Sequence, residues 1–91
     1  MRKEFGLTLS EFLRDLGRLS ADFQLDDDGR RLCLPWPPGE VEICFGEARP
    51  RRLGALCLPL LPVEFRFHNL NADERAGFLR RFERAFQRGG G

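Results

Sequence analysis

Residues 63–86, with the sequence VEFRFHNLNADERAGFLRRFERAF, decide the fold class of this chain. Val63, Phe65 and Phe67 alternate with polar neighbours, and this period of two is typical of a strand with one buried face. Beyond Asn71 the apolar side chains recur at a helical period, at Phe78, Leu79, Phe82 and Phe86. The stretch therefore predicts a sheet with one apolar face and a long helix whose apolar stripe covers that face.

Two capping patterns locate the predicted helices. Thr8 and Glu11 have the spacing of a capping box, in which each side chain accepts a hydrogen bond from the backbone N–H of the other residue. The amphipathic run that follows predicts a short first helix, which weakens at Gly17. Asn71 and Glu74 repeat the pattern, so the last helix is expected from about residue 72 to about residue 87.

The rest of the chain has the pattern of short strands separated by turns. Asp28-Gly29 is typical of a hairpin turn, because both residue types tolerate a positive φ. The prolines at 35–38 are expected to end a strand, since proline lacks a backbone N–H. Residues 46–52 are expected to form a turn, and residues 59–62 an irregular link. The predicted strands lie near residues 4–9, 21–26, 32–34, 40–45, 53–58 and 63–67.

These elements predict an α+β fold with the order β-α-β-β-β-β-β-α. Short turns make neighbouring strands antiparallel, so we expect a meander sheet of five or six strands with two helices on one face. The length fits one domain over residues 1–88, followed by a flexible glycine tail at 89–91. The element order resembles the helix-grip arrangement, and this resemblance implies room for an apolar ligand between the sheet and the last helix.

No motif in the sequence indicates catalysis, a metal site or a cofactor. Cys33, Cys44 and Cys57 form no C-x-x-C pair and are widely spaced, and the single histidine, His68, is not near them in sequence, which excludes a zinc site of the usual spacing. We therefore expect a protein that is not an enzyme and needs no cofactor. No apolar run follows the charged N-terminus or approaches the ~20 residues of a membrane span, so a cytoplasmic location without membrane contact is expected.

Charge is unevenly distributed along the chain, although the net charge is only +1. Residues 20–48 hold seven acids and two bases (7 − 2, a charge of −5), whereas residues 49–91 hold nine bases and four acids (9 − 4, a charge of +5). Pairing within one domain would explain this pattern, and so would self-association through poles of opposite sign. Nucleic acid is not expected as a partner, because the basic last helix also carries Glu74 and Glu83.

The polar positions of the last strand, Glu64, Arg66 and His68, are expected to lie on a solvated sheet face. Glu64 and His68 are ~13 Å apart along an extended strand, which is too far for a catalytic pair. Charge pairing across strands, with Glu42 opposite Arg66, is the expected arrangement.

Two apolar loops are candidates for a protein-binding surface. Trp36 lies among prolines, and Leu60 and Leu61 lie between two others. If both loops share one end of the sheet, these side chains form a single patch. The alternative is that Trp36 folds back over the core as a lid.

Phenylalanine rings on the last strand and the last helix allow two interpretations. They either fill a close-packed core or line a site for an apolar ligand, and the residues are Phe65, Phe67, Phe78, Phe82 and Phe86. The sequence therefore predicts a small, non-enzymatic protein-interaction or accessory module that self-associates, with a homodimer as one form. The alternative function is a small carrier of an apolar ligand.

Overall fold

The structure is a computed structural model that describes residues 1–86. The predicted glycine tail at 89–91 and the predicted helix end at Gln87 lie outside the described residues. The fold is α+β, with six antiparallel strands and two helices in the expected order. The elements are β1 (Arg2–Phe5), α1 (Leu9–Leu19), β2 (Gln24–Leu25), β3 (Arg31–Trp36), β4 (Gly39–Phe45), β5 (Arg49–Leu53), β6 (Leu56–His68) and α2 (Ala72–Phe86).

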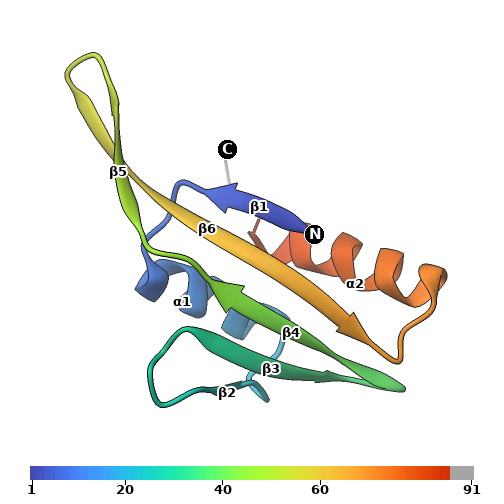
Figure 1. The fold of residues 1–91 in the computed structure, drawn as a ribbon. Coiled ribbons are helices and arrows are strands. Elements are labelled where there is room, and N and C mark those ends of the chain that lie inside the picture. The colour runs from blue at the N-terminus through green and yellow to red at the C-terminus, as the bar shows by residue number, and fades with distance from the viewer. Residues whose placement is uncertain (87–91) are drawn as a thin grey trace.

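The strands lie in the order β1-β6-β4-β3-β2, as Figure 1 shows, and β5 is off this path. A strict meander would place β5 between β4 and β6. Instead β4 pairs directly with the second half of β6, from Phe45 opposite Val63 to Glu40 opposite His68. β5 pairs only with the first part of β6, and the chain makes a hairpin excursion between β4 and its partner strand.

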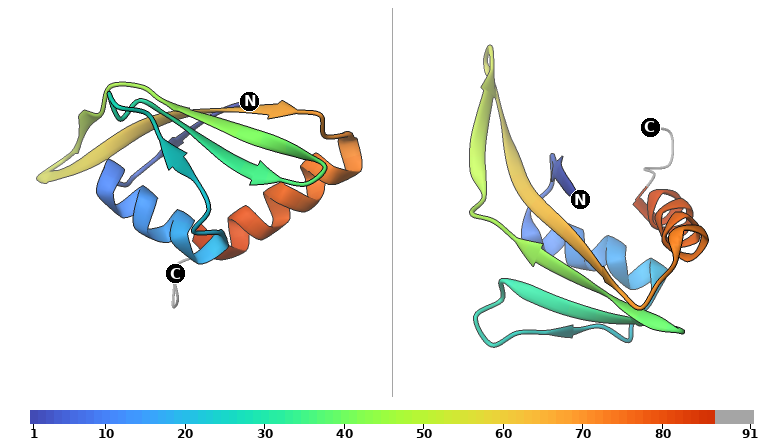
Figure 2. Two further views of the ribbon diagram at one scale, coloured as in Figure 1. Left: turned by 90° about the horizontal axis from the view of Figure 1, so that it is seen from below. Right: turned by 45° about the vertical axis from the view of Figure 1, so that its right-hand side comes forward.

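Both helices cover the same face of the sheet (Figure 2). Alternate residues of β3, β4 and β6 point toward the helices and are buried, which is the period expected of a half-buried sheet. Phe12 of α1 and Phe78 and Phe82 of α2 enter the same core and are at most 2% exposed. The predicted one-sided core is therefore confirmed.

The helix starts follow the predicted capping boxes. The Oγ1 of Thr8 accepts from the backbone N–H of Glu11 at 3.2 Å, and the Glu11 carboxylate accepts from the Thr8 backbone N–H at 2.9 Å. Asn71 and Glu74 make the same reciprocal bonds at 2.8 Å. Each box satisfies N–H groups that the first turn of a helix leaves without an intrahelical partner.

The prediction for residues 46–62 is wrong in its boundaries. The expected turn at 46–52 contains most of β5, and the expected strand at 53–58 is interrupted by the loop at 54–55. The expected irregular link is the middle of β6, a continuous strand of 13 residues. Proline is compatible with an antiparallel ladder where its missing N–H is not required. Pro50 lies opposite Pro59 in the β5–β6 register. Two prolines cannot exchange N–H···O bonds, so this pair must occupy a non-hydrogen-bonded position.

Strand β3 also passes through a proline that was expected to end it. Pro35 lies opposite Glu40, and Trp36 lies opposite Gly39, so the hairpin loop consists of Pro37 and Pro38 alone. The peptide bond between these two prolines is cis. The first two strands are shorter than predicted, because β1 ends at residue 5, before the cap of α1, and β2 spans only residues 24–25.

Candidate protein-binding surface

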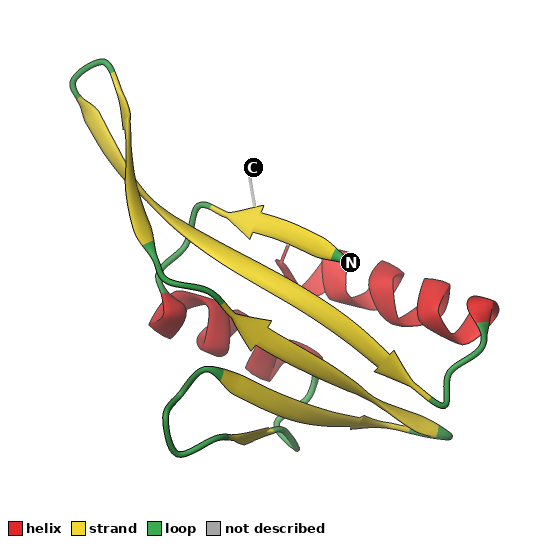
Figure 3. Cartoon of the chain, viewed as in Figure 1, coloured by secondary structure: helices red, strands yellow, loops and turns green. Residues whose placement is uncertain are grey.

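A two-stranded arm projects beyond the body of the sheet (Figure 3). The arm comprises β5 and residues 56–60 of β6, and these residues of β6 pair only with β5. Nearly all side chains of the arm are exposed, in contrast to the buried second half of β6. Because an isolated two-stranded ribbon is only marginally stable in water, the arm lacks the core that supports the other strands.

A two-residue turn closes the arm. Leu53 lies opposite Leu56, so Gly54 and Ala55 form the loop. Gly54 has a φ of +62°, whereas Ala55 keeps a negative φ. This combination corresponds to a type II′ turn, in which glycine takes the first loop position and the backbone twist matches that of the flanking strands.

One face of the arm carries a strip of leucines. Leu58 and Leu56 alternate along β6, and Leu53 lies directly opposite Leu56 on β5. Leu53, Leu56 and Leu58 are 50%, 63% and 42% exposed, which is unusual for leucine in a chain with a well-formed core. We call this set, with the half-buried Leu60, the leucine strip.

Arginines border the leucine strip. Arg49 lies opposite Leu60 and Arg51 opposite Leu58, so both arginines share the face of the strip. Arg52 lies opposite Cys57 on the other face. The arm therefore presents an exposed apolar surface with a cationic border, and apolar surface bordered by polar residues in this way is a feature of interaction sites.

The leucine strip continues into an open groove on the face of the sheet opposite the helices. Strand alternation places Leu58, Leu60, Pro62 and Glu64 on this same outer face. Pro62 and Glu64 line the groove, which has a volume of about 640 Å³. The other lining residues are Arg2, Lys3, Glu4, Cys44, Phe45, Gly46 and Val63.

The rest of the outer face is a network of paired charges. Glu42 Oε1 lies 3.0 Å from Nε2 of His68, and its Oε2 lies 3.3 Å from Nη1 of Arg31. The hydrogen bond from His68 lowers the pKa of the Glu42 carboxyl, and the nearby Arg31 guanidinium lowers it further. On the predicted solvated face, charged side chains therefore pair across strands, and Glu42 lies opposite Arg66 as expected.

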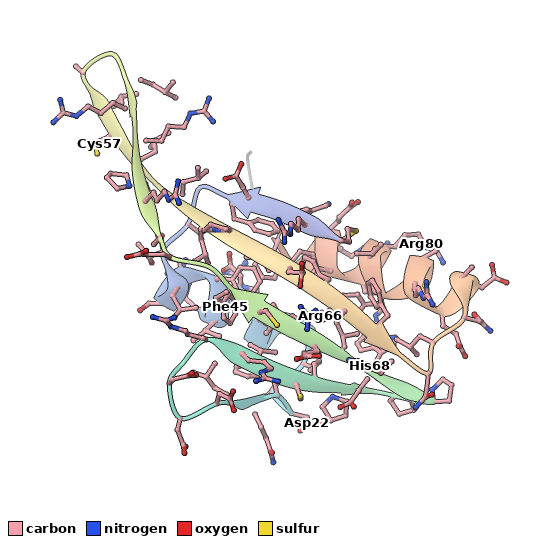
Figure 4. The ribbon with its side chains drawn as sticks, in the orientation of Figure 1. Asp22, Phe45, Cys57, Arg66, His68 and Arg80 are labelled. Atoms are coloured by element: carbon pink, nitrogen blue, oxygen red, sulfur yellow. The ribbon has the colours of Figure 1, made fainter. Side chains whose placement is uncertain are left out.

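A second group of paired charged side chains lies beside the groove. Glu64 accepts hydrogen bonds from Nε of Arg2 at 3.1 Å and from Nε of Arg66 at 2.8 Å. The hydrogen bond from Arg2 lowers the pKa of the Glu64 carboxyl most, and the hydrogen bond from Arg66 lowers it further. Figure 4 shows Arg66 and His68 on this face, away from the helices.

The outer-face network is poorly suited to nucleophilic chemistry. Cys44 Sγ lies 3.8 Å from Oε2 of Glu42, and burial together with the Glu42 charge raises the pKa of this thiol. A nucleophilic cysteine needs the opposite shift. Cys33 lies opposite Glu42, not opposite Cys44, and all three cysteines are free thiols. Within residues 1–86, no group of three His, Cys, Asp or Glu side chains could hold a metal ion.

The structure separates the residues expected to form one binding patch. Trp36 is half-buried and contacts Phe78 edge to face, with ring centroids 5.1 Å apart, while the Arg81 guanidinium lies over its ring at 5.4 Å. Leu61 is 2% exposed and belongs to the core, and Leu60 belongs to the leucine strip. Trp36 lies near the His68 end of β6, whereas Leu61 lies in the middle of that strand, so the two predicted loops do not share an end of the sheet.

The five phenylalanines proposed as core or ligand lining contact one another or their neighbours. Phe65 lies 5.1 Å from Phe82 between ring centroids, and Phe67 lies 5.9 Å from Phe78. Phe82 and Phe86 are stacked at 4.1 Å. None of the five lines the groove on the outer face of the sheet. This arrangement is that of a filled core.

Apart from Leu60, the residues of the arm were not predicted from the sequence as a binding element. The signals were present in the alternation of Leu56, Leu58 and Leu60 and in Gly54, which can take the positive φ of a hairpin loop. They were obscured because Pro59 and Pro62 have the pattern of strand breakers. Only the pairing register shows that neither proline interrupts the ladder.

Comparison with known proteins gives no match: no family model, no curated protein and no solved structure is significantly similar to this chain. Among the described residues, neither helix has the length and apolar character needed to cross a membrane.

Proposed function

We propose that this protein is a self-associating, non-enzymatic interaction module whose binding element is the β5–β6 arm. The observation that carries the proposal is the exposure of Leu53, Leu56 and Leu58 together on one face of a two-stranded ribbon. Apolar side chains gathered in this way are stabilised when a partner covers them. A partner that covers the arm would supply the apolar core that the arm lacks in the single chain.

The other surfaces support the choice of the arm. The outer sheet face already pairs its charges, with Glu42 and Glu64 each held by two basic side chains. Trp36, the other candidate anchor, contacts Phe78 and Arg81 within the chain. The packing of the phenylalanine rings favours this role over that of an apolar-ligand carrier, because the rings already fill the space where a ligand would bind.

Sedimentation velocity over a concentration series, with reductant to keep Cys57 free, tests the proposal. We expect the wild type to shift from monomer to a larger species as concentration rises from low micromolar to submillimolar. The double variant Leu56→Asn/Leu58→Asn should remain monomeric at the same concentrations. Cys57→Ser, on the same strand and the opposite face, is the matched control and should associate like the wild type.

Two results would contradict the proposal. One is a wild type that sediments as a monomer through the whole series. The other is a Leu56→Asn/Leu58→Asn variant that associates as strongly as the wild type while keeping its circular dichroism spectrum and unfolding midpoint.

A further inference from the structure

We infer that the arm of one copy docks on the free edge of β2 in a second copy, so that β5 extends the sheet of its partner. This inference rests on the proposed self-association and names the surface that receives the arm. A sheet edge with unpaired N–H and C=O groups is a template for strand addition. Strand β2 ends the sheet path, and β5 pairs with β6 alone, so each has one edge without a partner strand in the described chain.

Charge complementarity selects this pair of edges. Residues 49–60, which form the arm and its loop, hold three arginines and no acidic residue (a charge of +3). Residues 20–31 around β2 hold four aspartates and two arginines (2 − 4, a charge of −2). The four aspartates are all exposed: Asp22, Asp26, Asp27 and Asp28. Opposite charges across an interface fix which surfaces meet and speed their encounter.

The same charges disfavour the symmetric alternatives. Pairing β5 with β5 of a second copy would place Arg49, Arg51 and Arg52 against the same three arginines. Pairing β2 with β2 would bring two sets of four aspartates together. Like charges juxtaposed in an interface suppress association, whereas β5 on β2 brings opposite charges together.

Apolar and geometric features of the β2 edge also fit the arm. Leu25 is 41% exposed on β2, beside the aspartates, and offers apolar surface to the leucine strip. Figure 4 labels Cys57 on the arm and Asp22 at the far side of the sheet, and Figure 2 shows the same separation of arm and β2. One copy therefore does not satisfy its own β2 edge with its own arm, which leaves that edge available to a second copy.

Charge reversal with mixing tests the inference. The arm variant is Arg49→Glu/Arg51→Glu/Arg52→Glu, and the β2 variant is Asp22→Arg/Asp27→Arg. Asp26 and Asp28 are left unchanged, because Asp26 pairs with Arg31 at 3.4 Å and Asp28 accepts the Arg30 backbone N–H in the turn. Circular dichroism and thermal unfolding establish that each variant folds, and sedimentation of nuclease-treated protein measures association.

We expect each variant alone to associate about tenfold or more weakly than the wild type, since each then presents like charges at the junction. An equimolar mixture should restore association, because the acidic arm of the first variant meets the basic β2 edge of the second, and the converse junction is also complementary. Arg80→Glu on the exposed face of α2 is the control and should leave association unchanged.

Three outcomes would overturn the inference. If the β2 variant associates like the wild type while the arm variant does not, the arm binds elsewhere and the proposed function stands. If the mixture stays monomeric, the two surfaces do not meet. If wild-type association disappears on nuclease treatment, a nucleic acid bridges the copies instead. A wild type that is monomeric without nuclease treatment contradicts the proposed function itself.

Discussion

Phe65 of β6 and Phe82 of α2 meet edge to face across the seam between sheet and helix, with ring centroids 5.1 Å apart and ring planes at 83°. Phe65 is 1% exposed and Phe82 is 2% exposed. This contact joins the two elements whose sequence pattern defined the fold class. It packs α2 against the body of the sheet, and the arm projects from that body.

Replacing Phe82 by alanine should therefore destabilise the whole domain. Truncation of a buried phenylalanine costs about 3–5 kcal/mol, from lost burial and from the cavity that remains. Arg80→Ala, on the exposed side of the same helix, should change the free energy of unfolding by about 0.5 kcal/mol or less. Urea unfolding of both variants measures the difference, and a Phe82→Ala loss below about 1 kcal/mol would show that the seam is not packed as described.

Trp36→Ala separates the two roles considered for this side chain. Because Trp36 contacts Phe78 and Arg81, we expect a loss of about 2–3 kcal/mol, below the ~3–5 kcal/mol typical of a fully buried aromatic. The free energy of unfolding is again the measured quantity. A variant as stable as the wild type would mean that the ring is a surface group and that its contacts with α2 add nothing.

Substitution by alanine should have opposite effects on stability at Gly39 and at Gly17. A Cβ at Gly39 would collide with the backbone carbonyl oxygens of His68 and Asn69, so Gly39→Ala should push β4 away from the end of β6. We expect a loss of about 2 kcal/mol or more, on the scale of overpacked sites. Gly17 lies in α1 with open space at its Cβ, so Gly17→Ala should stabilise by about 0.5–1 kcal/mol.

Thermal unfolding of the two alanine variants provides the comparison. The melting temperature should fall for Gly39→Ala and rise for Gly17→Ala. A Gly39→Ala protein that melts with the wild type would contradict the close approach of the β4 start to residues 68–69.

The pKa of Glu42 predicts how stability depends on pH. The hydrogen bond from His68 and the Arg31 charge lower this pKa in the folded state, below the ordinary value of a glutamate side chain. A lowered folded-state pKa contributes stability that is present above the unfolded-state pKa and is lost as pH falls through the folded-state pKa. Glu42→Gln should therefore be less stable than the wild type near neutral pH, and the difference should vanish under acid.

Denaturant unfolding at several pH values from neutral to 3 measures this difference. The control is Glu47→Gln, which removes an exposed carboxyl outside the network. A gap between wild type and Glu42→Gln that stays constant across the acid range would show that the ion-paired form of Glu42 does not stabilise the fold.

The sequence was sufficient for the elements whose patterns are local. The alternation at residues 63–67, the stripe from Phe78 to Phe86 and both capping boxes predicted strand, helix and helix starts that the structure confirms. These signals depend only on the spacing of residues within one element. The contact of Phe65 with Phe82 followed from placing the two apolar faces together.

The arm and the position of Trp36 depend on partners distant in sequence. Whether Pro59 interrupts a strand is decided by its cross-strand neighbour, which is Pro50, and no local pattern identifies that neighbour. Whether Trp36 is covered is decided by where α2 crosses the β3–β4 hairpin and brings Phe78 and Arg81 against the ring. The sequence therefore left the arm unpredicted and both positions of Trp36 open, even where the fold class was correct.

Amide hydrogen exchange at two protein concentrations tests the central claim, that the arm is the surface through which copies associate. A ribbon without a core opens readily, so its amides should exchange rapidly at low concentration. At high concentration we predict slower exchange in residues 49–60 and in the β2 edge at 22–26, with β4 unchanged. Equally rapid exchange of the arm at both concentrations, in protein that sedimentation shows to be associated, would contradict the account.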